Sequence, residues 1–171
     1  ADLMIEAALR VERAGADFLL ICTNTMHKLA DQVADAINIP LLHIADATAA
    51  TILSAGSSKI GLLGTRFTME EDFYRGRLEK HHGLEVLIPS ADDRRLVHDV
   101  IYDELCLGII REESRLAYTR IIDKLVSQGA QGVILGCTEI SLLVKPEHAT
   151  CPLFDTTRIH AIRAVDRALT D

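Results

Sequence analysis

The stretch FLLICTNTMHK, residues 18–28, decides the fold that this chain is expected to adopt. A short apolar run stops at small polar residues, and a helix-like spacing of apolar residues follows it. A second stretch, GVILGCTEISLL at residues 132–143, has the same arrangement. Runs that are apolar throughout, rather than alternating, are typical of parallel strands buried on both faces of a sheet. The sequence therefore predicts one strand-to-helix connection that is built twice.

Both stretches lie within a longer internal repeat. The segment RAGADFLLICTNTMHKLA resembles SQGAQGVILGCTEISLLV, and in this alignment Thr23 matches Cys137. Two such units predict two similar α/β lobes that face each other across a cleft. The plainer alternative is that α/β folds repeat strand and helix without any functional reason.

The rest of the chain also alternates between helical and strand patterns. This alternation predicts an α/β fold of two pseudo-symmetric lobes, each with a parallel sheet flanked by helices. We expect residues 1–55 plus 155–171 to form the N-terminal lobe and residues 56–154 to form the second lobe. The loop SAGSS, residues 54–58, is the best candidate for the crossing between them.

Composition and charge exclude several classes of partner. The chain carries 49% hydrophobic and 25% charged residues, an ordinary profile for a globular protein. A net charge of −7 without a basic patch argues against nucleic acid as a partner. The apolar runs are much shorter than the roughly 18 residues that a membrane span requires, and no signal peptide pattern opens the sequence. A small molecule is therefore the expected partner.

The cysteines argue against a metal site. None of the four forms a C-x-x-C pair, and no histidine cluster completes a zinc pattern. Sparse, unpaired cysteines fit a reducing cytoplasm, which is the expected location. The four are Cys22, Cys106, Cys137 and Cys151.

The two strand ends carry candidate binding groups. Ligands of parallel α/β sheets bind beyond the carboxyl ends of the strands, where helix N-termini offer free N–H groups to anions. Asn24, Thr25 and Thr138 add amide and hydroxyl groups there, so a carboxylate is the natural ligand. Alternatively, these residues only cap the helices that follow.

Cys137 is the candidate reactive residue. It follows a glycine and precedes a predicted helix, where the helix dipole is expected to lower the pKa of a thiol and favour the thiolate. Cys22 lies one position earlier in its own repeat, so strand alternation predicts that it points into the core. Thr23 is then the counterpart of Cys137, and Cys106 and Cys151 are expected to be structural.

Three further residues have candidate roles at the cleft. Glu139 lies at the start of the second helix and either favours the helix dipole or positions a substrate amine. Thr65 ends another strand and is expected to line the cleft. His27 either tunes the cleft or is a buried histidine with satisfied hydrogen bonds, the commoner case. No lysine lies in a setting that suggests pyridoxal phosphate, so no cofactor is expected.

The motifs CTNTMHK and LGCTEISLL, joined by KIGLLGTRFTMEEDFYRGRL, resemble the aspartate/glutamate racemase superfamily over essentially the whole chain. The resemblance implies a cofactor-independent enzyme of two pseudo-symmetric lobes, acting on acidic amino acids as a homodimer. In symmetrical members, one cysteine from each motif flanks the substrate α-carbon, and the two act as base and acid on opposite faces. The resemblance therefore implies catalytic roles for Cys137 and Thr23.

This sequence departs from the symmetrical pattern in two ways. Threonine stands at position 23 in place of a cysteine, and a hydroxyl lacks the acidity of a thiol. The subgroup with this Thr/Cys pair implies a preference for the L form of aspartate or glutamate. Family members also begin with a strand and a Gly-rich loop, so the resemblance implies that the N-terminal lobe lacks its first strands here. An apolar stripe that includes Leu3, Met4 and Val11 is consistent with a missing neighbour.

Two alternatives stay open. A single cysteine in the same superfamily also serves the decarboxylation of a malonate or the cis–trans isomerisation of an unsaturated diacid. A different class of protein would bind a carboxylate without catalysis.

Overall fold

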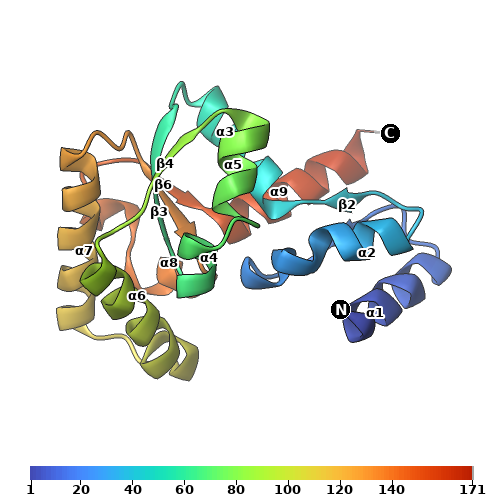
Figure 1. Cartoon of the computed structure of the whole chain (residues 1–171), viewed down its shortest axis with the longest axis horizontal. Helices are drawn as coiled ribbons and strands as arrows, with labels where there is room; N and C mark the ends of the chain where they lie inside the picture. The colour runs from blue at the N-terminus through green and yellow to red at the C-terminus, as the bar shows by residue number, and fades with distance from the viewer. Residues whose placement is uncertain (171) are drawn as a thin grey trace.

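The computed structural model describes residues 1–170 and contains two parallel sheets (Figure 1). The smaller sheet pairs two strands, and the larger sheet has the order β4-β3-β5-β6. The strands are β1 (Leu19–Leu20), β2 (Leu41–Leu42), β3 (Lys59–Gly64), β4 (Glu85–Leu87), β5 (Val133–Gly136) and β6 (Leu153–Asp155).

Helices connect these strands and cover the sheets. The α-helices are α1 (Asp2–Arg13), α2 (Ala30–Ala36), α3 (Ile44–Ser54), α4 (Arg66–Glu70), α5 (Arg75–His82), α6 (Ala91–Asp103), α7 (Glu112–Ser127), α8 (Ile140–Leu143) and α9 (Thr156–Leu169). The 3₁₀ helices are η1 (Thr25–Leu29), η2 (Leu105–Leu107) and η3 (Pro146–His148).

The two sheets have separate cores. Ala8 of α1 packs with Val33 and Ile37 against the smaller sheet. The larger sheet buries a much bigger cluster, centred on the fully buried strand residues Ile60, Leu62 and Ile134. In Figure 1, α1 and α2 lie at one end of the long axis, and α6 and α7 lie at the other. The predicted fold class, α/β with parallel sheets flanked by helices, is confirmed.

The division into lobes is less simple than the sequence suggests. The buried side chains of α3, among them Ile44 and Ile52, belong to the larger core. The helix α3 also packs against α9, which follows the last strand of the larger sheet. The boundary between residues 55 and 56 stays a prediction, and the cores show only that two clusters exist.

One expected helix is interrupted. The sequence TMEEDFYRGRLEKHH, residues 68–82, predicts one helix that ends before Gly83, but the structure has α4 and α5 with a break between them. Met69 and Tyr74 are both fully buried. On one continuous helix, a separation of five residues turns the second side chain about 140° away from the first. The break allows both side chains to reach the same core.

Helix composition also bears on the membrane expectation. Within residues 1–170, no helix combines the length and the apolar character that crossing a bilayer requires.

Candidate functional site

The carboxyl ends of β3 and β5 meet at one point of the larger sheet. Gly64 pairs with Gly136 in the parallel register, so the next residues, Thr65 and Cys137, leave neighbouring strand ends. A Cβ atom on Gly136 would lie 2.8 Å from the carbonyl oxygen of Leu63, and one on Gly64 would lie 2.9 Å from the carbonyl oxygen of Gly136. Both strand ends are glycine because a side chain has no room there.

The segment after β1 reaches this same edge. The Asn24 side-chain amide donates to the Thr156 hydroxyl at 3.0 Å, and that hydroxyl donates to the Leu135 carbonyl oxygen at 2.9 Å. The hydroxyls of Thr25 and Thr65 lie 3.2 Å apart, within hydrogen-bond distance. These bonds link the first sequence motif to the strand ends of the larger sheet. They bring together three of the predicted site residues and place them near the start of the Cys137 segment.

The orientation of the Asn24 amide follows from these bonds. The Thr156 hydroxyl donates its only proton to a carbonyl oxygen, so it can only accept from Asn24. The nitrogen of the Asn24 amide must therefore face Thr156. The other end of the amide, Oδ1, is buried and has no hydrogen-bond partner among the described residues. An unpaired buried acceptor typically costs about 1–3 kcal/mol, so this oxygen is suited to a ligand donor.

Thr23 is partly exposed and its backbone is fixed by His27. Nδ1 of His27 donates to the Thr23 carbonyl oxygen at 2.7 Å, and Nε2 accepts from the backbone N–H of Ile44 at 3.1 Å. This pattern requires the neutral imidazole. Burial lowers the pKa of His27 to about 4. Of the two interpretations of His27, the structure fits the buried histidine whose hydrogen bonds are satisfied. The same side chain positions the Thr23 backbone.

The Cys137 side chain is partly buried, and its thiol donates to Glu139 Oε2 at 2.9 Å. Burial, and then the neighbouring Glu139 carboxylate, raise the pKa of the Cys137 thiol to about 12. The expected lowering of this pKa is therefore wrong. The helix α8 that follows covers only Ile140–Leu143, so its dipole is weak, and a carboxylate faces the sulfur.

Glu139 occupies the N-cap position of α8, but its side chain makes no capping hydrogen bond. Partial burial alone would raise the pKa of the Glu139 carboxyl. Hydrogen bonds from Cys137 and Thr138 outweigh this effect and lower the pKa. The carboxylate is therefore ionised at neutral pH beside a protonated thiol. Thr138 itself lies partly buried between these two residues in the chain.

The expectation about Cys22 needs revision. Cys22 was expected to point into the core, but it is exposed. The strand β1 ends at Leu20, so the alternation of strand side chains does not extend to position 22. Cys106 is also exposed, whereas Cys151 is partly buried.

Two neighbours of the site were missed by sequence reasoning. Thr156 joins Asn24 to β5, and the side chain of Thr68 packs against the positions where Gly64 and Gly136 would carry Cβ atoms. Thr156 follows the strand LFD directly, so the strand-end rule that selected Thr65 could also have selected it.

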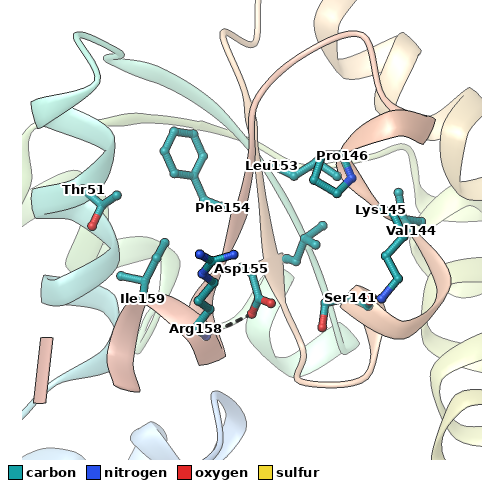
Figure 2. Close-up of a pocket in the computed structure, with 11 residues that line it drawn as sticks. Thr51, Ser141, Val144, Lys145, Pro146, Leu153, Phe154, Asp155, Arg158 and Ile159 are labelled. Atoms are coloured by element: carbon teal, nitrogen blue, oxygen red, sulfur yellow. Dashed lines mark hydrogen bonds between the residues drawn. The ribbon is translucent and has the colours of Figure 1, made fainter. Parts of the chain in front are cut away.

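A cavity of about 490 Å³ lies beside β6 and is lined by Leu135, Asp155, Lys145 and Arg158, among others (Figure 2). The Asp155 carboxylate caps α9 by accepting from the backbone N–H groups of Thr157 and Arg158. None of the predicted site residues lines this cavity. We therefore locate the candidate site at the strand ends, where the hydrogen bonds between the two sheets converge.

Acid should destabilise this fold through its buried histidines. Burial lowers the pKa of His27 to about 4 and of His43 to about 3, below the ordinary value of 6.5. The unfolded chain then binds more protons than the folded chain as the pH falls from 6.5 toward 4, so stability is lost across this window. We expect the free energy of unfolding to fall by about 3 kcal/mol from His27 alone.

Urea unfolding at pH 7 and pH 4.5 measures this loss. His27→Gln should flatten the pH dependence, whereas substitution of the exposed His81 by Gln should leave it unchanged. An identical pH dependence in wild type and His27→Gln would contradict the assignment.

Parallel sheets with a thiol, hydroxyls and an amide gathered at their strand ends define an α/β protein with a candidate small-molecule site at that edge. The chain belongs to the Asp/Glu/Hydantoin racemase family, whose sequence model matches residues 1–164. This membership confirms the family resemblance of the two motifs.

The relatives described next are longer than this chain. A provisionally named Asp/Glu racemase from Yersinia pestis is 57% identical, with a TM-score of 0.95 over 99% of this chain and 74% of its own. An aspartate racemase homologue from Pyrococcus horikoshii OT3 is 37% identical, with a TM-score of 0.88 over 98% of this chain and 73% of its own. The broad specificity amino-acid racemase RacX of Bacillus subtilis is 24% identical over 90% of this chain, which spans 66% of RacX.

Proposed function

We propose that this chain carries the catalytic centre of a cofactor-independent racemase of acidic amino acids. Cys137 exchanges a proton with one face of the substrate α-carbon, and Thr23 lies on the opposite face. The observation that carries the proposal is the pair of bridges, Asn24 to Thr156 and Thr25 to Thr65, which join the first motif to the strand ends beside Cys137.

The polar groups of the site suit an amino acid. The unpaired Oδ1 of Asn24 accepts hydrogen bonds, so it suits an ammonium group. In this proposal the hydroxyls of Thr25, Thr65 and Thr138, which here bond one another or Glu139, turn to donate to the substrate carboxylate. This division refines the expectation that Asn24 binds the carboxylate, because the donor end of its amide is already bonded to Thr156.

The resting site holds Cys137 as a thiol, whereas the first step of racemisation removes the α-proton. Cys137 holds its proton, so in this state it is a proton donor to a planar, enolate-like intermediate. Removal of the α-proton by Cys137 requires the thiolate. Thr23, directly or through water, supplies or accepts the proton on the other face. Preorganised donors at the carboxylate stabilise the negative charge that develops there.

The names of the relatives support the reaction type. They include an amino-acid racemase of broad specificity and an aspartate racemase homologue. Acidic substrates, a preference for the L enantiomer, a homodimer and a cytoplasmic location are the finer parts of the proposal. The two lobes, residues 1–55 with 155–171 and residues 56–154, are proposed to close over the substrate and exclude water.

Chiral chromatography of each enantiomer of aspartate and glutamate tests the proposal. The racemase forms the opposite enantiomer from at least one of these acids. Carbon dioxide release from a substituted malonate, with no racemisation, would favour the decarboxylase instead. Ligand binding without turnover, unchanged by Cys137→Ser, would favour the carboxylate-binding module.

The pairing of Thr23 with Cys137 makes a directional prediction. Thr23→Cys introduces a thiol on the face that has only a hydroxyl, so racemisation of the disfavoured enantiomer should rise, by roughly tenfold. The ratio of initial rates from the two enantiomers measures the change. Thr51→Cys, on α3, serves as a control for adding a cysteine elsewhere and should leave the ratio unchanged. No gain from Thr23→Cys would contradict the two-face geometry.

A further inference from the structure

Cys137 and Glu139 form a direct acid pair at the candidate site. The thiol Sγ lies 2.9 Å from Oε2 of Glu139, and both residues follow the buried end of β5. The sulfur packs against the larger core, whereas Glu139 is only partly buried. Glu139 is therefore a group that contacts the sulfur directly and is also open to solvent.

The charged groups around the sulfur disfavour the negative charge of a thiolate. The groups whose charge acts on the thiol are Glu139 and Cys106, and both are acids. The hydroxyl of Tyr118 lies nearby but donates to the Val97 carbonyl oxygen. Glu139 is thus the acceptor within reach of the Cys137 proton, while the backbone N–H of Glu139 is the group that favours the resulting thiolate.

A racemase that uses a thiol must restore the protonation state of that thiol after each turnover. After the thiolate removes an α-proton it is a thiol, and after the thiol donates a proton it is a thiolate. Each turnover in one direction therefore leaves Cys137 in the wrong protonation state for the next turnover in that direction. A group must carry the proton between the partly buried sulfur and water.

We propose that Glu139 is this group, a proton shuttle between the Cys137 thiol and solvent. In the outward step, the S–H bond breaks, an O–H bond forms at Oε2, and the electron pair stays on sulfur. The carboxylic acid then releases the proton to water. The inward step is the reverse. This inference rests on the proposed function and gives Glu139 a role other than positioning the substrate amine.

The shuttle explains why Glu139 leaves the N-cap unsatisfied. A short carboxylate such as that of Asp accepts from the backbone of the helix that it begins, and the longer Glu side chain is less suited to this. Here the side chain turns toward the sulfur and makes no capping hydrogen bond. The bound ammonium group of the substrate, held by Asn24 in our proposal, would supply the positive charge that favours the thiolate.

Glu139→Gln separates a shuttle from a structural acceptor, because a shuttle predicts that alkylation of Cys137 speeds up while racemisation slows down. The amide removes the negative charge beside the sulfur, so iodoacetamide should alkylate Cys137 faster at pH 8, by about tenfold or more. Glutamine cannot take the proton, so the steady-state racemisation rate should fall by about 10²-fold. Glu139→Asp keeps the carboxylate and should recover part of the rate.

Peptide mass spectrometry follows alkylation at Cys137 itself, and racemisation is followed with the same protein. Glu147→Gln, an exposed loss of one negative charge, is the matched control and should change neither rate. Unchanged alkylation in Glu139→Gln, or unchanged racemisation by a Glu139→Gln protein whose wild type is active, would overturn the shuttle. A wild type that racemises neither acid would overturn the proposed function instead, and the alkylation result would still stand.

Discussion

Replacing Cys137 with serine is expected to abolish racemisation of both enantiomers. A serine hydroxyl is a far weaker acid than a thiol and gives no base comparable to a thiolate, so the rate should fall by roughly 10²–10⁴-fold in both directions. Initial rates from chiral chromatography give the size of the loss. Serine differs from cysteine by a single atom, and position 137 is only partly buried, so the fold should persist.

Cys151→Ser is the matched control for this loss. Cys151 is also a free, partly buried cysteine, but it lies at the opposite end of β6 from the strand-end site. We expect its replacement to leave the rate unchanged. Equal activity of Cys137→Ser and wild type would remove Cys137 from the mechanism.

A methyl group at Gly136 should damage both stability and activity. Its carbon would lie 2.8 Å from the Leu63 carbonyl oxygen and 3.3 Å from Cγ2 of Thr68. The nearer atom belongs to the backbone of the neighbouring strand, so β3 and β5 must separate. We expect Gly136→Ala to lower the free energy of unfolding by roughly 2–3 kcal/mol. The displaced strand end should also slow racemisation by about 10²-fold.

Gly76→Ala provides the comparison. Gly76 lies in α5, and its added carbon would meet the side chain of Asp72 at 3.3 Å. That side chain is exposed and can move, so the change in unfolding free energy should stay within about 1 kcal/mol. Urea unfolding of both variants tests the contrast. Equal stability of Gly136→Ala and Gly76→Ala would contradict the proposed crowding at the strand ends.

The strands could be predicted because their sequence signal is local. Apolar runs such as KIGLLG and GVILG become β3 and β5, and their parallel pairing follows from the helices between them. The break between α4 and α5 could not be predicted from periodicity. It depends on Met69 and Tyr74 sharing a core that only the folded chain defines.

The position of several polar side chains at the strand ends could be predicted for the same reason, and their role in a site stays a prediction. Asn24, Thr25 and Thr65 follow strands, and in the folded chain Thr25 contacts Thr65 while Thr156 joins Asn24 to β5. The charge state of Cys137 was mistaken because the sequence shows a helix start but neither its short length nor the turn of Glu139 toward the sulfur. Those features depend on local backbone geometry that residue type does not fix.

Deuterium incorporation from heavy water tests the central claim most directly, since it reports proton exchange at the α-carbon without requiring net racemisation. The account predicts that the wild-type protein introduces one deuterium at the α-carbon of aspartate or glutamate, and that Cys137→Ser introduces none. Exchange of the α-hydrogen that persists in Cys137→Ser at the wild-type rate would contradict it.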